Sequence, residues 1–166
     1  MTTERTIRIT TGGDLKNYYG LSSEHIDALA VLGFHLYRQG KLKEAETVFN
    51  GLIALDEQSF YGHAGLGTVA LSQGSPDLQK ACKHLEQAAQ INPKDPNVHA
   101  NLGEGLLRSA RFKEAARSFE TCLALDPGLL QAGSKRARAI IRTIDVISDH
   151  VAALTSESAP GRPRES

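Results

Sequence analysis

The sequence contains no tryptophan, a single methionine and two cysteines among its 166 residues. Aromatic residues make up only 5% of the chain, so the hydrophobic fraction of 40% consists largely of alanine and leucine, which favour helices. Neither sign of charge prevails, because 19 Lys and Arg residues balance 19 Asp and Glu residues. Proteins that bind nucleic acid through its phosphates are normally basic, so we do not expect nucleic acid as the main partner.

Long hydrophobic runs are also missing from the sequence. No stretch approaches the roughly 18 consecutive apolar residues of a membrane span, so no stable membrane insertion is expected. The first ten residues, MTTERTIRIT, contain charges and lack the apolar block of a secretory signal, which predicts a cytoplasmic location. Cys82 and Cys122 lie 40 residues apart without a CxxC pair, so we expect reduced thiols in the core rather than a disulfide framework or a zinc site.

The sequence repeats itself with a period of 34 to 36 residues. Each unit has a Leu-Gly pair, then an alanine, then a large apolar residue four positions later, and a closing Asp or Asn. These are Leu32-Gly33, Ala45, Phe49 and Asp56, then Leu66-Gly67, Ala81, Leu85 and Asn92, then Leu102-Gly103, Ala115, Phe119 and Asp126. Small residues let two antiparallel helices approach closely, and the large residue fills the space between repeats. Each unit is therefore predicted to be a helical hairpin.

This pattern resembles the tetratricopeptide repeat. It predicts an all-α protein, an α-solenoid of three tetratricopeptide repeats with a C-terminal capping helix. The expected segments are a flexible N-terminal segment over 1–20, a repeat domain over 21–154 with repeats at about 26–59, 60–95 and 96–129, a capping helix over 129–154 and a disordered tail over 155–166. Two extra residues in the second repeat are expected to lengthen the loop around Gln73 to Asp77.

The predicted capping helix has one apolar stripe, formed by Ile140, Ile144, Ile147, Val151 and Leu154. Covering the open end of the solenoid is its expected role, and formation of a homodimer through the same stripe is the alternative. The same helix has a basic stripe of Lys135, Arg138 and Arg142 with Arg136 beside it, which we interpret as a solvated face, with an acidic protein patch as the alternative.

No arrangement of residues in the sequence indicates catalysis. The Gly65-Leu66-Gly67 and Gly103-Glu104-Gly105 pairs lack the remaining features of a nucleotide-binding loop, and no nucleophile has a base at a suitable spacing. We therefore expect no enzyme activity, no catalytic residue, no cofactor and no metal. His63 and His99 occupy equivalent positions in adjacent repeats and could lie near each other, but without a third ligand they are interpreted as packing residues.

The first helix of each hairpin is expected to line a concave groove. Its inward positions are Asp27, Ala30, Phe34 and Tyr37, then Tyr61, Ala64, Thr68 and Leu71, then Asn97, Ala100, Glu104 and Leu107. Most of these residues are apolar or aromatic, which predicts a groove that accepts hydrophobic side chains. A carboxylate clamp, in which repeats of this kind hold an acidic chaperone C-terminus, needs cationic or amide side chains where this sequence has Ala30, Phe34, Thr68, Ala100 and Glu104.

Residues 12–74 narrow the resemblance further. Gly12-Gly13, Leu21-Ser22-Ser23, the segment LAVLGFHLYRQGKLKEAETVFNGLIALD and Gly65-Leu66-Gly67 follow in an order and spacing similar to the class II translocator chaperones of bacterial type III secretion systems. The segment with Pro93, Asp95, Pro96 and Glu104 resembles the third repeat of those proteins.

The resemblance implies a bacterial cytoplasmic chaperone that uses no ATP. Such a chaperone would hold N-terminal segments of hydrophobic translocator proteins in its groove and keep them soluble, with Phe34 and Tyr37 as groove aromatics. The resemblance also leads us to expect a homodimer. A general repeat scaffold for a bacterial protein complex is the alternative function.

Overall fold

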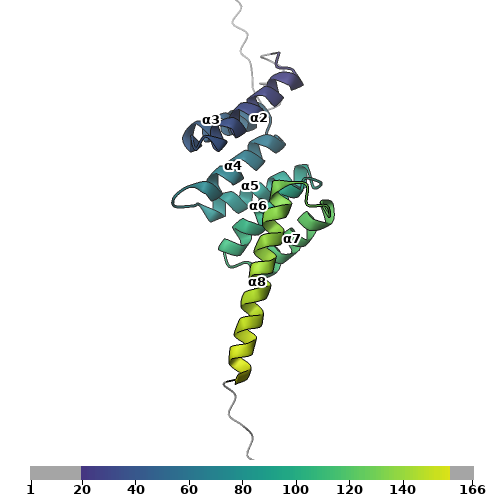
Figure 1. Cartoon of the computed structure of the whole chain (residues 1–166). Coiled ribbons are helices and arrows are strands. Elements are labelled where there is room, and N and C mark those ends of the chain that lie inside the picture. The colour runs from purple at the N-terminus through teal and green to yellow at the C-terminus, as the bar shows by residue number, and fades with distance from the viewer. Residues whose placement is uncertain (1–19, 158–166) are drawn as a thin grey trace, which may run out of the picture.

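The computed structural model describes residues 20–157 and contains, within that range, seven α-helices and no strand. The helices are α2 (Ser23–Arg38), α3 (Leu42–Leu55), α4 (Phe60–Ser72), α5 (Leu78–Ile91), α6 (Pro96–Arg108), α7 (Phe112–Leu125) and α8 (Ala132–Glu157) (Figure 1). The predicted all-α class is confirmed. The predictions for residues 1–19 and 158–166 lie outside the described residues.

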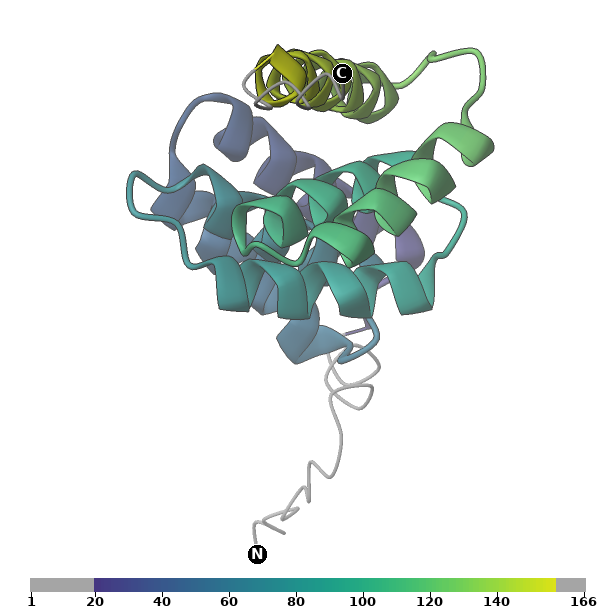
Figure 2. The same cartoon turned by 90° about the horizontal axis from the view of Figure 1, so that it is seen from below.

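The helices form three hairpins that follow one another in chain order. Within each hairpin α2 packs on α3, α4 on α5 and α6 on α7, and contacts between α3 and α4 and between α5 and α6 join neighbouring hairpins. The last helix, α8, packs against α6 and α7 and lies along one side of the stack (Figure 2). This arrangement is the predicted α-solenoid of three tetratricopeptide repeats.

Polar side chains begin several of these helices. Ser22 accepts a hydrogen bond from the backbone N–H of His25 at the start of α2. Asp77 does the same for Lys80 after the lengthened loop of the second repeat. Asp95 accepts from the N–H groups of Asn97 and Val98, with Pro96 in the first turn of α6. Local sequence therefore sets where the hairpins turn.

The repeated glycines lie where the two helices of a hairpin touch. A Cβ atom on Gly33 would lie 2.6 Å from the ring of Phe49, and one on Gly103 would lie 2.6 Å from the ring of Phe119. Phe49 is fully buried and also packs against Gly65 of the following repeat, where a Cβ would lie 2.3 Å from its ring. The predicted role of the large residue between repeats is thereby confirmed.

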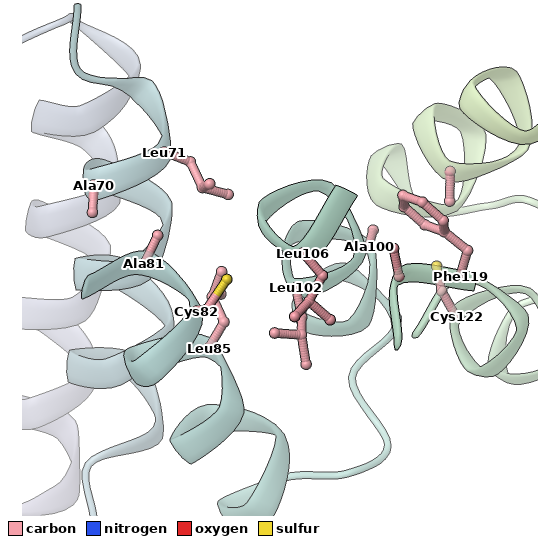
Figure 3. Packing of buried hydrophobic residues seen from close by; sticks show 12 residues of the cluster. Ala70, Leu71, Ala81, Cys82, Leu85, Ala100, Leu102, Leu106, Phe119 and Cys122 are labelled. Atoms are coloured by element: carbon pink, nitrogen blue, oxygen red, sulfur yellow. The ribbon is translucent and has the colours of Figure 1, made fainter. Parts of the chain in front are cut away.

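The main core lies between the second and third hairpins and α8. Its buried members shown in Figure 3 are Ala70, Leu71, Ala81, Cys82, Leu85, Ala100, Leu102, Leu106, Phe119 and Cys122. Both cysteines are free and buried, and burial raises the pKa of the Cys82 and Cys122 thiols. They are core residues in the thiol form, as expected from the sequence.

The last helix begins later than the sequence predicts, at Ala132 instead of residue 129, and ends at Glu157 instead of residue 154. Leu129 adopts a left-handed φ of 52°, which no α-helix can include. The Asp126 carboxylate accepts hydrogen bonds from the N–H groups of Leu130 (3.0 Å) and Gln131 (2.8 Å), which hold the chain in a turn. The same bonds hold the pKa of Asp126 below its ordinary value.

His63 does not lie beside His99, contrary to the suggestion from their equivalent positions. Its Nε2 donates to the carbonyl oxygen of Glu57 (3.1 Å), so its Nδ1 accepts a hydrogen bond from Nδ1 of His84 at 3.0 Å. His99 instead contacts the carbonyl oxygen of Pro93 at 2.9 Å. Equivalent positions in successive repeats are one whole hairpin apart. The helix between them, α5, therefore supplies the nearer partner of His63, which is His84.

The partly buried His84 makes stability sensitive to acid. The pKa of His84 is held below its ordinary value of 6.5 by burial first, and further by His63, Lys80 and Lys83. The unfolded chain therefore binds this proton more readily than the folded protein does, and stability is lost as the pH falls below about 6.5. We expect the urea midpoint to decrease between pH 7 and pH 5 in wild type. His84→Gln should reduce that decrease, whereas His99→Gln should preserve it. An equal decrease in all three proteins would contradict this prediction.

Candidate functional site

The inner helices α2, α4 and α6, together with the start of α8, enclose a groove of about 550 Å³. Its lining residues are Phe34, Tyr37, Arg38, Thr68, Leu71, Ser72, Asn97, Asn101, Glu104, Ala132, Gly133 and Arg136. A neighbouring cavity of about 240 Å³ shares Phe34, Thr68, Asn97 and Asn101 with it and adds Phe60, Tyr61, Ala64, Asp95 and Val98. The shared residues make these two cavities one surface, which we call the concave groove.

The structure brings eight of the predicted inward residues to this groove. Phe34, Tyr37, Thr68, Leu71, Asn97 and Glu104 line the larger cavity, and Tyr61 and Ala64 line the smaller one. Four predicted residues lie elsewhere. Asp27 is exposed and lines neither cavity. Ala30 is buried in the core of the first hairpin, and Ala100 is buried beneath α8. Leu107 lines a separate pocket between α7 and α8.

The wall contributed by α2 and α4 is aromatic and apolar at Phe34, Tyr37 and Leu71, and its polar members are Arg38, Thr68 and Ser72. The ring of Phe34 meets that of Phe49 edge to face, with centroids 5.0 Å apart, so Phe34 belongs partly to the core. The hydroxyl of Tyr37 lies 3.0 Å from Oγ of Ser72, which joins the first hairpin to the second across the groove. The hydroxyl of Thr68 donates to the carbonyl oxygen of Ala64 at 2.7 Å and accepts from Nδ2 of Asn101 at 3.0 Å.

The wall contributed by α6 and α8 is polar, which the sequence prediction missed. Glu104 forms ion pairs with Arg136 of α8 (3.1 Å) and Arg108 (3.7 Å). Arg136 also donates to the side-chain oxygen of Asn101. The prediction of a mostly apolar groove is therefore wrong for this wall. Counting inward positions along each hairpin describes the repeats alone, so it could not show that α8 packs back onto them.

The amides of this wall are already paired within the protein. Oδ1 of Asn97 accepts from the Gly133 N–H at 3.0 Å, and Nδ2 of Asn101 donates to Thr68 at 3.0 Å. The Asn97 contact holds the first turn of α8 against α6, and the Asn101 contact joins α6 to α4. Arg136, which the sequence analysis assigned to a solvated stripe, is one of the residues that close the groove. The only local sign of this wall in the sequence was Asn101, an amide in the second turn of α6.

The described residues give no sign of other chemistry. Within residues 20–157, no helix is both long enough and apolar enough to cross a membrane. In the same part of the chain, no three His, Cys, Asp or Glu side chains gather as potential metal ligands.

Comparisons with known proteins show which proteins this chain resembles. No family model matches the chain. It is 35% identical over 113 residues to the chaperone protein SicA of Salmonella typhimurium, a match that covers 68% of this chain and 67% of SicA. It is 30% identical over 104 residues to the low calcium response locus protein H of Yersinia pestis, covering 63% of this chain.

Solved structures agree with these relatives. PcrH in complex with the chaperone binding region of PopD superimposes with a TM-score of 0.65 at 25% identity, covering 78% of this chain and 97% of PcrH.

The matches do not extend over the whole length of every relative. The chain spans 61% of the low calcium response locus protein H, and 4% of Superkiller protein 3 of Schizosaccharomyces pombe, with which it is 37% identical over 65 residues. The match to SicA, by contrast, reaches two thirds of both proteins, and the same helical hairpins recur in PcrH. The chain therefore belongs to the family of type III secretion translocator chaperones that includes SicA.

Proposed function

We propose that this chain is a bacterial cytoplasmic chaperone that binds an apolar N-terminal segment of a type III secretion translocator in its concave groove and keeps that protein soluble until secretion. The main observation is the set of apolar groove residues from α2 and α4, of which Phe34 and Tyr37 are partly exposed. The chain also belongs to a family whose members are chaperones and not enzymes. PcrH, a structural relative at 27% identity, is seen in complex with the chaperone binding region of PopB.

The two unlike walls suit an extended segment with alternating side chains. Apolar side chains of the client would contact Phe34, Tyr37 and Leu71, and polar ones would face Asn101 and Arg136. Burying three apolar anchors contributes roughly 5 to 9 kcal/mol, and the cost of ordering a flexible segment offsets several of these. A short segment should therefore bind with about micromolar affinity.

The geometry does not favour a carboxylate clamp. Glu104 would repel a terminal carboxylate, and Arg136 is already paired with Glu104. The side chain of Asn97 accepts from Gly133 of α8, and that of Asn101 donates to Thr68 and accepts from Arg136 of α8. An acidic peptide would have to break these contacts before it could bind.

Co-expression with a membrane-inserting translocator from the same genome tests the proposed function. We expect the translocator to remain in the soluble fraction and to elute together with this chain, and to precipitate when it is expressed alone. A translocator that stays insoluble in both cases would contradict the proposal. Copurification of soluble complex subunits only would indicate the alternative, a general repeat scaffold.

A further inference from the structure

The concave groove has a surplus of positive charge at one end. Three charged side chains line the larger cavity, and they are Arg38, Glu104 and Arg136. The Glu104 carboxylate already forms ion pairs with Arg136 (3.1 Å) and with Arg108 (3.7 Å), so one negative charge faces two positive charges there. Arg38 adds a further positive charge that no carboxylate of the described lining balances.

Arg38 is the arginine of this group that no other side chain holds. Within residues 20–157, its guanidinium forms neither a hydrogen bond nor an ion pair. The side chain is exposed and lines the larger cavity. It follows Phe34 by one helical turn, so both residues lie on the same face of α2. A carboxylate that enters the groove beside Phe34 can therefore pair with Arg38 without breaking any contact within the protein.

The other end of the concave groove is aromatic. The rings of Phe60 and Tyr61 meet edge to face with their centroids 5.3 Å apart, and Tyr61 is 41% exposed. The one charged residue in the described lining of this smaller cavity is Asp95. Its carboxylate accepts hydrogen bonds from the N–H groups of Asn97 (2.8 Å) and Val98 (3.1 Å). This end therefore suits an apolar side chain, and Asp95 would repel a second carboxylate.

The two ends are close enough for one short segment to reach both. Tyr61 lines the aromatic end and Ser72 lines the basic end, and at 1.5 Å per residue α4 spans about 16 Å between them. Phe34 and Thr68 lie between these ends, because they line both cavities. An extended chain rises about 3.3 Å per residue, so about five of its residues cover this distance.

We infer that the groove selects a client segment with an Asp or Glu side chain within about five residues of the apolar side chains that it buries, and that Arg38 binds this carboxylate. The aromatic end around Tyr61 takes an apolar side chain, so the charges of the groove determine which end of the segment lies at which end of the groove. This inference rests on the proposed function, because it names the chemistry of the segment bound there. It differs from a carboxylate clamp, since Arg38 has no existing partner and the carboxylate belongs to a side chain.

Fluorescence anisotropy with a labelled N-terminal segment of the translocator, at about 50 mM salt, tests the role of Arg38. We expect Arg38→Gln to bind the segment about three- to fivefold more weakly than wild type, as for an ion pair near a protein surface. At about 500 mM salt this difference should disappear, because salt screens exposed charges. Lys43→Gln is the matched control, since Lys43 is an exposed cation of the same hairpin that lines neither cavity. It should bind like wild type.

Variants of the segment show which of its groups Arg38 binds. Each Asp or Glu of the segment is replaced in turn by Asn or Gln. One replacement should weaken binding to wild type as much as Arg38→Gln does, and the same replacement should leave the affinity of Arg38→Gln unchanged. If the segment binds wild type and Arg38→Gln equally well, or if no replacement matters, the inference is wrong and the proposed function stands. Failure of the segment to bind wild type would contradict the proposed function and this inference together.

Discussion

Gly67→Ala is expected to lower the free energy of unfolding by about 3 kcal/mol, a large effect for one methyl group. The new Cβ would lie 2.5 Å from Cγ of Leu85 and 3.2 Å from the carbonyl oxygen of Ala81. Leu85 is fully buried, and its Cγ is a branch point that cannot swing away as the end of a flexible chain can. The substitution should therefore force α4 and α5 apart in the middle of the stack.

Gly51→Ala provides the matched control, because it is the same chemical change within another helix. No atom lies within 4 Å of a Cβ placed on Gly51, which is exposed on α3. Alanine favours a helix over glycine by up to about 1 kcal/mol, so this variant should be as stable as wild type or slightly more stable. Urea denaturation followed by circular dichroism measures both. Equal stability of the two variants would show that α4 and α5 separate without cost.

The fold was predictable because its packing is encoded in a short, repeated pattern. The Leu-Gly pair and the large residue after the alanine mark a contact within each hairpin, as the close approach of Gly103 to Phe119 shows. A contact of this kind depends on residues 16 to 18 positions apart in one unit, so three copies of the unit reveal it. The helix starts at Ser22 and Asp77 were predictable for a similar reason, since capping is local.

The groove was only half predictable, because one of its walls depends on a contact outside the repeat. Counting along a hairpin correctly placed Phe34 and Tyr37 inward, but it could not show that Ala100 lies beneath α8. The position of α8 depends on the turn held by Asp126 and on the pairing of Glu104 with Arg136. No periodic pattern contains these two features, so the polar wall could be seen only in the folded structure.

A position on the inner face of a helix did not by itself show whether a side chain lines the groove. Ala30 was expected in the groove because it lies on the inner face of its helix, yet it is only 3% exposed and packs within the first hairpin. A side chain as short as alanine does not reach past its larger neighbours. Leu107, at the far end of its helix, instead faces the pocket between α7 and α8.

Tyr37→Glu is expected to weaken binding of a translocator segment at least 30-fold, which corresponds to about 2 kcal/mol. Tyr37 lines the apolar wall of the concave groove and its ring is half-buried, so a carboxylate there would have to lose water when an apolar client covers it. Phe34→Glu would be a poorer test, because the contact of Phe34 with Phe49 ties it to the core and the variant would lose stability as well.

Val31→Glu is the control for Tyr37→Glu, since it introduces the same charge on the same helix. Val31 is 67% exposed and lines neither cavity of the groove. Fluorescence anisotropy with a labelled N-terminal translocator peptide measures the affinity, and thermal melting by circular dichroism shows whether each variant is folded. We expect Val31→Glu to bind like wild type and both variants to melt within a few degrees of it. If the two variants bind equally well, the client does not use the aromatic wall of the groove, and its binding surface must be sought elsewhere on the repeats.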